Sequence, residues 1–266
     1  MNVLYSITLL LGLLAPSSAA QSLFRLLDPA ASHVDFVHPF TQNHPQAYLY
    51  DSGLAAGGIC LGDVNGDGHL DIYLVSGAEE NRLYIKTKVS GYKNATIPSS
   101  LPHQDRWGTG ANLVDIDNDG DLDLYQCNYD APNQLLLNDG KGKFTELSGA
   151  AGLAVHDASM AANFADVDND GDLDMFLLCN RMYNSKGRPE RMPVSNRPGQ
   201  VPQVLESHRK YMKLHRRDDG SYGIEEYGRA DYFFLNEGLD DQGIPHFKDV
   251  SKESGLRLFG HGMSSI

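Results

Sequence analysis

Apolar and polar segments follow one another along the chain in a unit that occurs three times. Each unit has a short apolar segment, an acidic loop and then a continuous apolar run: 59–61, 112–114 and 163–165 precede the loops, and 72–75, 124–127 and 175–178 follow them. The runs after the loops lack the alternation of a half-exposed strand. They therefore predict strands that are covered on both faces.

Further strand-like segments complete each unit. A third one follows at 82–85, 134–137 and 232–235, and a Gly-containing turn leads to a fourth at 144–147 and 247–250, whereas the corresponding part of the first unit, around 89–102, is degenerate. Four short strands in a period of about 50 residues are typical of β-propeller blades. We predict an all-β propeller with units at about 50–102, 103–153 and 154–256, and the start of a further unit at 257–266.

The three acidic loops share one nine-residue pattern. Residues 63–71 read DVNGDGHLD, residues 115–123 read DIDNDGDLD and residues 166–174 read DVDNDGDLD, and consecutive loops begin 52 and 51 residues apart. Oxygen-bearing side chains at positions 1, 3, 5 and 9 can converge on one point, because glycine at position 6 permits a sharp turn that also brings the position-7 carbonyl inward. Such a set supplies the hard oxygen ligands that Ca²⁺ prefers.

The pattern therefore predicts three Ca²⁺ sites. In each loop the position-7 residue is expected to contribute its backbone carbonyl. The predicted ligands are Asp63, Asn65, Asp67, His69 and Asp71 in the first loop, Asp115, Asp117, Asp119, Asp121 and Asp123 in the second, and Asp166, Asp168, Asp170, Asp172 and Asp174 in the third.

EF-hand loops begin in the same way, but they require a glutamate at position 12 and flanking helices. Position 12 is Leu74, Gln126 or Leu177, each inside a β-type run, so EF-hands are excluded. A metal-free Asx-rich turn can explain one such loop, but three loops in register, each with the ninth-position aspartate, favour metal sites. Mg²⁺ is disfavoured because it rarely uses all-protein cages.

The repeats resemble FG-GAP/VCBS repeats, the blade unit of integrin α-chain heads and of many secreted bacterial proteins. The segment from Val34-Asp35-Phe36 through Asp51-Ser52-Gly53 is similar to the N-terminal blade of cartilage acidic protein-like, ASPIC/UnbV-associated chains. The resemblance covers about residues 33–266 apart from an insertion. It implies a propeller, commonly seven-bladed, with Ca²⁺ loops between the first two strands of a blade. Because the chain holds about four blades' worth of sequence, we expect it to form part of a larger ring.

Charge narrows the range of partners. The 266-residue chain has 35 Asp and Glu against 22 Lys and Arg, a net charge of −13, which disfavours binding to bare nucleic acid or to an anionic membrane. The insertion at about 181–230 differs, since ten Lys and Arg but only two Glu lie between residues 181 and 217. This basic insertion is expected to be a solvated loop or a docking segment, for the acidic body or for an anionic partner.

The first twenty residues predict a signal peptide. The apolar run at 3–15 is too short to span a bilayer, and small residues at Ser18 and Ala20 suit cleavage before Gln21. We expect residues 1–20 to be removed and the mature protein to be secreted, either extracellular or periplasmic, without a membrane span. A buried N-terminal strand or helix is the alternative.

The remaining chemistry favours binding over catalysis. No zinc, nucleophile or phosphate-binding motif occurs, and no catalytic residue can be nominated. Cys60, Cys127 and Cys179 predict buried free thiols, with a Cys127–Cys179 bridge left open. We expect a binding, adhesion or structural module for a protein or glycan partner. A calcium-dependent polysaccharide lyase or hydrolase on the same scaffold is the alternative, because a fold does not fix function.

Overall fold

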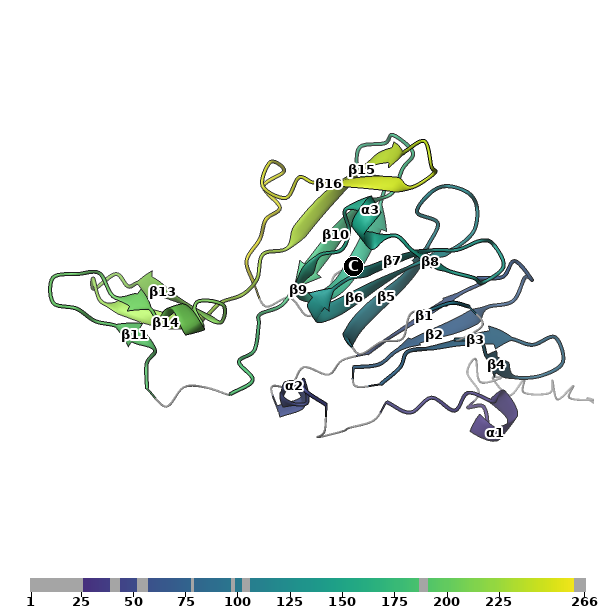
Figure 1. The fold of residues 1–266 in the computed structure, drawn as a ribbon, viewed down its shortest axis with the longest axis horizontal. Coiled ribbons are helices and arrows are strands. Elements are labelled where there is room, and N and C mark those ends of the chain that lie inside the picture. The colour runs from purple at the N-terminus through teal and green to yellow at the C-terminus, as the bar shows by residue number, and fades with distance from the viewer. Residues whose placement is uncertain are drawn as a thin grey trace, which may run out of the picture.

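The computed structural model describes residues 26–38, 44–51, 57–77, 79–96, 99–101, 106–186 and 191–260. The predicted signal peptide at 1–20 and the last six residues of the predicted further unit lie outside the described residues. Regular structure in the described part is nearly all β, as predicted (Figure 1). The helices there are single turns: α1 (Pro29–Ser32), α2 (Tyr48–Asp51), α3 (Ser148–Ala151) and the 3₁₀ turn Glu206–His208. No helix in the described ranges is long and apolar enough to cross a bilayer.

Twelve strands form three antiparallel four-stranded units, which we call blades. Strands β1 to β4 form the first blade, β5 to β8 the second, and β9, β10, β15 and β16 the third. The second and third blades are joined into one curled sheet, because the end of β6 pairs with the start of β9. The bounds are β1 Gly58–Gly62, β2 Asp71–Val75, β3 Arg82–Lys86, β4 Tyr92–Asn94, β5 Trp107–Val114, β6 Asp123–Pro132, β7 Gln134–Leu137, β8 Thr145–Glu146, β9 His156–Ala165, β10 Asp174–Cys179, β15 Tyr232–Leu239 and β16 Pro245–Asp249.

The strands expected from the apolar pattern are present in the expected order. One region differs, since the segment interpreted as degenerate in the first unit contains a fourth strand, β4, which pairs with β3. Its residues Tyr92, Lys93 and Asn94 have no apolar pattern because most of them face solvent at the sheet edge. Backbone pairing, which does not depend on side-chain type, therefore forms a strand that the hydrophobic pattern cannot reveal.

The first strands of the three blades, β1, β5 and β9, lie side by side. Glycine permits this close approach: a Cβ atom on Gly58 would lie 3.1 Å from the Cα of Gly110, and a Cβ on Gly110 would lie 2.8 Å from the carbonyl oxygen of Met160. Successive four-stranded blades arranged around their innermost strands are the arrangement of a β-propeller. The fold is thus β-propeller-like, as predicted.

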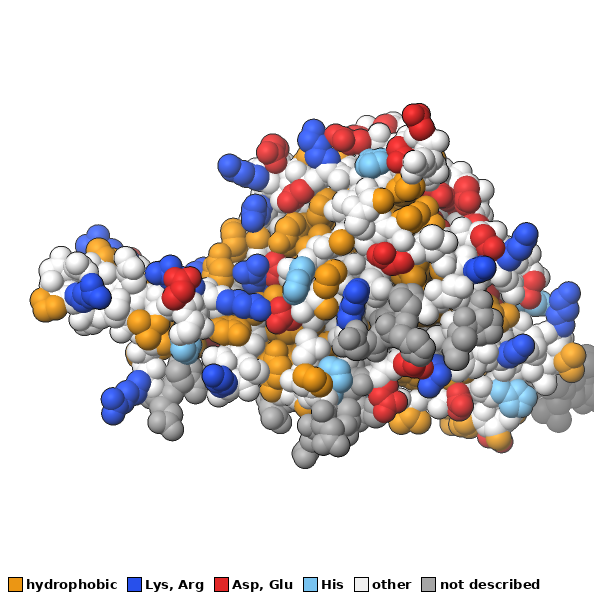
Figure 2. Space-filling view, viewed as in Figure 1, with side chains coloured by type: hydrophobic (Ala, Val, Ile, Leu, Met, Phe, Trp, Pro, Cys, Tyr) orange, Lys and Arg blue, Asp and Glu red, His pale blue; other side chains and the backbone are white. Residues whose placement is uncertain are grey.

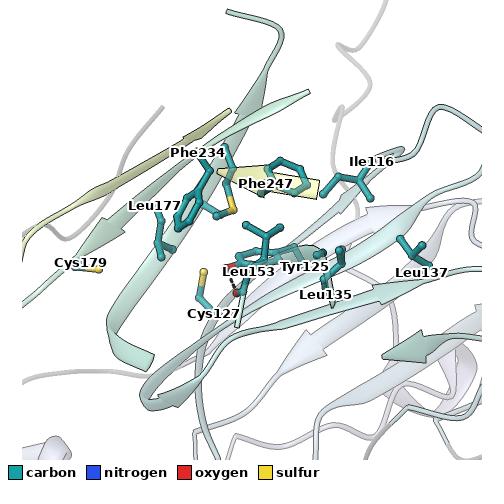
Figure 3. Close-up of a cluster of buried hydrophobic side chains, with 13 residues drawn as sticks. Ile116, Tyr125, Cys127, Leu135, Leu137, Leu153, Leu177, Cys179, Phe234 and Phe247 are labelled. Atoms are coloured by element: carbon teal, nitrogen blue, oxygen red, sulfur yellow. Dashed lines mark hydrogen bonds between the residues drawn. The ribbon is translucent and has the colours of Figure 1, made fainter. Parts of the chain in front are cut away.

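The hydrophobic core lies between successive blades. Figure 3 shows the cluster between the second and third blades, in which Tyr125 and Leu135 of the second face Leu177 and Phe234 of the third. Cys127 and Cys179 are free thiols buried in this same cluster, as predicted, whereas Cys60 is only partly buried, contrary to the prediction. A second cluster joins the first and second blades in the same way, through Val64, Tyr73, Val75, Leu83, Leu124, Leu136 and Phe144.

A buried polar residue occupies the same place in each blade, directly before the third strand. It is Asn81 in the first blade, Asn133 in the second and Asp231 in the third. Its Oδ1 accepts a backbone N–H from within or just after the second strand, namely that of Ser76, Asn128 or Cys179. The side-chain amide of Asn81 also donates to Gln126 of the second blade, and that of Asn133 donates to Ser159 of the third. These amides therefore link one blade to the next.

The insertion in the third unit folds into a lobe that projects from the blades, at the left of Figure 1. It contains two small hairpins, β11 (Val194–Ser195) with β12 (Gln203–Val204), and β13 (Met212–Arg216) with β14 (Tyr222–Glu226). Lys210 of the lobe binds both carboxylate oxygens of Asp130 in β6, at 2.8 and 3.0 Å. Arg229, where the chain returns to the third blade, binds the buried Asp157 of β9. Ion pairs thus hold the lobe onto the blades.

Candidate metal centres

Each acidic loop connects the first strand of a blade to the second. The ninth loop residue is the first residue of the second strand, namely Asp71 of β2, Asp123 of β6 and Asp174 of β10. Position 12 lies within these strands, at Leu74, Gln126 and Leu177, and this confirms that the loops are not EF-hands.

The ninth-position aspartates are buried and hydrogen-bonded to the backbone of their own blade. All three are at most 1% exposed. Asp123 accepts the backbone N–H of Ile116, at 3.0 Å, and that of Asn138 after β7, at 2.8 Å. Asp71 and Asp174 make the same two bonds, from the second loop residue and from the third strand or its end. Each carboxylate therefore joins the loop to the outer part of its own blade.

The first-position aspartates close the turn. Asp63, Asp115 and Asp166 each accept the N–H of the position-6 glycine, at 2.6, 3.1 and 3.1 Å. That glycine has a φ of +83°, +95° or +99° in the three loops, a conformation that glycine adopts readily. Its role in the turn is as predicted.

Position 4 also has a left-handed backbone conformation in every loop, which was not predicted. Gly66 has a φ of +70°, Asn118 of +60° and Asn169 of +63°. Glycine and asparagine are the residues that tolerate this conformation best. Their presence at the same position of all three loops was the signal that could have revealed it.

The structure brings together positions 1, 3 and 9 in two of the loops. One carboxylate oxygen from each of Asp115, Asp117 and Asp123 lies within 4.8 Å of the other two, and the same holds for Asp166, Asp168 and Asp174. The first loop has Asn65 at position 3, and therefore one carboxylate fewer. These are distances that one cation could bridge.

The predicted ligands at positions 5 and 7 are placed differently. Asp67, Asp119 and Asp170 are outside the two close sets, and each accepts the N–H of the position-7 residue, at 3.0, 3.0 and 2.9 Å. The side chains of His69, Asp121 and Asp172 are outside those sets as well. Coordination by the position-7 carbonyl and by the position-5 carboxylate remains a prediction.

Electrostatics in the second loop favours a bound cation. Burial raises the pKa of Asp123 to about 7, although its two backbone donors oppose the shift. Burial, and then the neighbouring carboxylates of Asp119, Asp117 and Asp115, raise the pKa of Asp121 to about 6. Both shifts reflect the cost of carrying negative charge there without a compensating positive charge.

Two oxygens in the second loop are buried without any hydrogen-bond donor, namely Oδ1 of Asp115 and Oδ1 of Asp121. A buried acceptor without a partner is costly, and a metal ion is one group that can satisfy it. The donor set contains only oxygens apart from the imidazole of His69, as a hard cation requires. The residues present therefore fit a divalent cation.

Hydrogen bonds from asparagine side chains connect adjacent loops. The side-chain amide of Asn118 in the second loop donates to the carbonyl of Gly171, at 3.2 Å, and to Oδ1 of Asp172, at 2.8 Å, both in the third loop. The amide of Asn138, between the first and second loops, donates to the carbonyl of Val64, at 2.8 Å. Side-chain amides thus connect each loop to the next.

Comparison with known proteins agrees with the repeat structure. The family model described as an FG-GAP-like repeat matches twice, over residues 63–126 and 115–177. A search of curated proteins gave no match. Among solved structures, the chain is similar to one from work on the specific recognition of non-reducing terminal N-acetylglucosamine by an Agrocybe aegerita lectin, with 17% identity and a TM-score of 0.28.

That similarity covers 76% of this chain and 52% of the lectin chain, so this chain spans about half the length of that structure. A TM-score this low gives it no weight for fold or function. The family match instead begins at the first aspartate of the first acidic loop and continues into β10. Residues 63–177 therefore match FG-GAP-like repeats, and this stretch contains all three acidic loops and the whole of the second blade.

Proposed function

We propose that this protein is an exported, calcium-binding β-propeller module that binds protein or glycan partners. The observation that carries the calcium assignment is the buried Oδ1 of Asp115, which has no hydrogen-bond donor and belongs to the close carboxylate set with Asp117 and Asp123. A second buried oxygen without a donor, Oδ1 of Asp121, lies in the same loop outside that set. Export rests on the sequence of residues 1–20 alone.

The chemistry of the donors supports Ca²⁺ over other cations. Carboxylate, amide and carbonyl oxygens at loop positions are typical of Ca²⁺, whereas Zn²⁺ and the later transition metals use nitrogen and sulfur ligands. In the described residues the close carboxylate sets contain no histidine and no cysteine. Mg²⁺ usually keeps several waters and is seldom enclosed by protein alone.

The residues have distinct roles in this proposal. Asp115, Asp117 and Asp123 would hold the ion in the second loop, and Asp166, Asp168 and Asp174 would hold it in the third. Asp63, Asn65 and Asp71 are the corresponding residues of the first loop. When bound, the ion would neutralise the clustered carboxylates and fix the turn that joins the first two strands of the blade.

The lobe is the surface that we propose for a partner. Lys186, Arg191, Arg197 and Arg216 are exposed on it, and none of them forms an ion pair with a carboxylate of the described residues. In Figure 2 the lobe carries several basic side chains, whereas acidic and basic side chains are interspersed over the blades. An anionic group on a protein or glycan would approach the lobe more readily than the acidic blades.

Calorimetric titration of the purified protein with CaCl₂, after treatment with EGTA, tests the calcium assignment. We expect three binding equivalents, and a lower affinity or no binding for Mg²⁺. A chain with Asn65→Ala, Asp117→Ala and Asp168→Ala together should bind none, while keeping its β-rich circular dichroism. Absence of calcium heat in the folded wild type would overturn the assignment.

A further inference from the structure

We infer that Asn118 couples the calcium sites of the second and third loops, so that an ion bound in one loop raises the affinity of the other. This inference rests on the proposed function, because it concerns how two of the proposed sites communicate. It depends on one side chain that belongs to one loop and is hydrogen-bonded to the next.

Asn118 is held firmly in the second loop. It lies between two predicted ligands, Asp117 and Asp119, and its backbone is left-handed, with a φ of +60°. The N–H of Asp119 donates to Oδ1 of Asp117 at 3.3 Å, which spans this residue. Any ordering of the carboxylates around it therefore also orders the backbone from which its side chain projects.

The other end of the contact is equally specific. The Nδ2 atom of Asn118 donates to the carbonyl of Gly171 and to Oδ1 of Asp172. The N–H of Gly171 donates to Asp166 and that of Asp172 donates to Asp170, so both acceptors lie on the turn that orients those carboxylates. The amide thus connects the turn of one site to the turn of the next.

Coupling follows from this shared order. An ion that fixes the third loop fixes both acceptors of Asn118, and the second loop then loses less conformational freedom when its own ion binds. Thermodynamic linkage makes the effect equal in both directions. Repulsion between two bound dications acts against it, but that effect is screened over about 10 Å in salt and does not depend on the Asn118 side chain.

The chain contains its own controls for this contact. Position 4 of the first loop is Gly66, which has no side chain, so the first site lacks this connection to the second. Position 4 of the third loop is Asn169, which has nearly the same backbone conformation. Among the described residues, its side chain makes no hydrogen bond to another acidic loop.

The experiment is a thermodynamic cycle measured by calcium calorimetry. An Asn65→Ala background disables the first site, and its loss is verified by a fall from three equivalents to two. In that background we would measure the second site alone (with Asp168→Ala), the third site alone (with Asp117→Ala), and both together. In the two-site protein with Asn118 present, we take the product of the two calcium association constants. Its ratio to the product of the two single-site association constants should be about five or more.

Asn118→Gly should reduce this ratio of association constants to about the value that repulsion between the two bound ions alone would give, while both sites still bind calcium. Glycine is suited to the left-handed backbone, and Gly66 already occupies the same position, so the loop should still fold. Asn169→Gly is the matched control and should leave the ratio unchanged. Asn118→Asp places a carboxylate opposite Asp172 and should reduce the ratio at least as much.

The possible outcomes separate the two proposals. No calcium binding by the folded parent chain would overturn the proposed function and this inference together. Calcium binding with the same ratio in the parent and in Asn118→Gly would overturn only the coupling. A ratio that falls equally in Asn118→Gly and Asn169→Gly would also overturn it, since the loss would then come from loop flexibility.

Discussion

Asp157 and Arg229 form a bidentate ion pair that joins the first strand of the third blade to the end of the inserted lobe. Nε of Arg229 contacts Oδ1 of Asp157, and Nη2 contacts Oδ2 at 2.9 Å. The carboxylate is 1% exposed and also accepts the hydroxyl of Tyr232, at 2.9 Å. A buried charge held in this way is expensive to leave without its partner.

Arg229→Ala should therefore destabilise the protein. The buried Asp157 carboxylate would keep its neutral donors but lose its positively charged partner. We therefore expect the free energy of unfolding to fall by about 3 kcal/mol. Chemical denaturation measures it. The control is Arg209→Ala, which breaks an exposed pair with Glu206 on the lobe and should cost less than about 1 kcal/mol. Similar losses in both variants would show that the buried pair has no special role.

Calcium removal should lower thermal stability. If each site binds with a dissociation constant of ~10 µM, ~1 mM Ca²⁺ adds roughly 2.7 kcal/mol per occupied site. Melting curves recorded in CaCl₂ and in EGTA should therefore differ, and the shift should grow with calcium concentration. Magnesium chloride at the same ionic strength is the control and should give a smaller shift. Identical melting curves in CaCl₂ and EGTA would contradict the prediction.

Positions 9 and 5 of the second loop should respond differently to substitution in EGTA. Asp123→Ala removes the acceptor of two backbone N–H groups, those of Ile116 and Asn138, and should cost about 2 kcal/mol even without calcium. Asp119→Ala removes an exposed side chain and should change apo stability by no more than about 0.5 kcal/mol.

With calcium present, each of these two variants should lose calcium stabilisation at the second site and keep the first site unchanged. The third site should still bind, with the weaker affinity that follows from losing its coupling to the second. Denaturation in EGTA and in CaCl₂ separates the two contributions. If Asp123→Ala were harmless in EGTA, the ninth position would serve the metal only. If either substitution removed calcium binding at all three loops, the sites could not be separate.

The contact between Asp35 and Tyr84 predicts a pH dependence. The hydroxyl of Tyr84 donates to Asp35 at 2.5 Å, and this hydrogen bond is the main reason that the pKa of Asp35 is lowered from 3.8. A lowered pKa contributes stability that is fully present well above pH 3.8 and is lost as the pH falls through the lowered value.

NMR titration of the Asp35 carboxyl should thus give a pKa below 3.8 in the wild type. In Tyr84→Phe the value should move back towards 3.8, because the hydrogen bond to the ionised form is gone. Tyr92→Phe, which alters another tyrosine of the first blade, should leave it unchanged. An unshifted value in the wild type would show that the contact does not form in solution.

The acidic loops were predictable because their chemistry is local. Positions 1, 3 and 9 meet through a turn of nine residues, so spacing alone placed Asp115, Asp117 and Asp123 together. The covered strands were predictable for a related reason. A run such as that of β10, without polar alternation, can be accommodated only between two layers.

What the sequence did not show depends on contacts between distant segments. The bond from Asn118 to Asp172 joins residues 54 positions apart, and no pattern within either loop implies it. The fold of the lobe was not predictable either, because its hairpins are too short to give a clear pattern. Its attachment also depends on Asp130, which binds Lys210 from 80 residues earlier in the chain. The left-handed backbone at position 4 was predictable from the glycine and asparagine residues found there, but the metal pattern concerns only the oxygen ligands.

The residue before the third strand has a consequence for what can lie against the third blade. Asn81 and Asn133 each present N–H groups towards the neighbouring blade, so the group that meets them there is an acceptor. Asp231 has the same place but, when ionised, has no proton to give. The polarity of the contact is reversed, and any group that meets this side chain must be a donor, such as an amide, a hydroxyl or a cationic side chain.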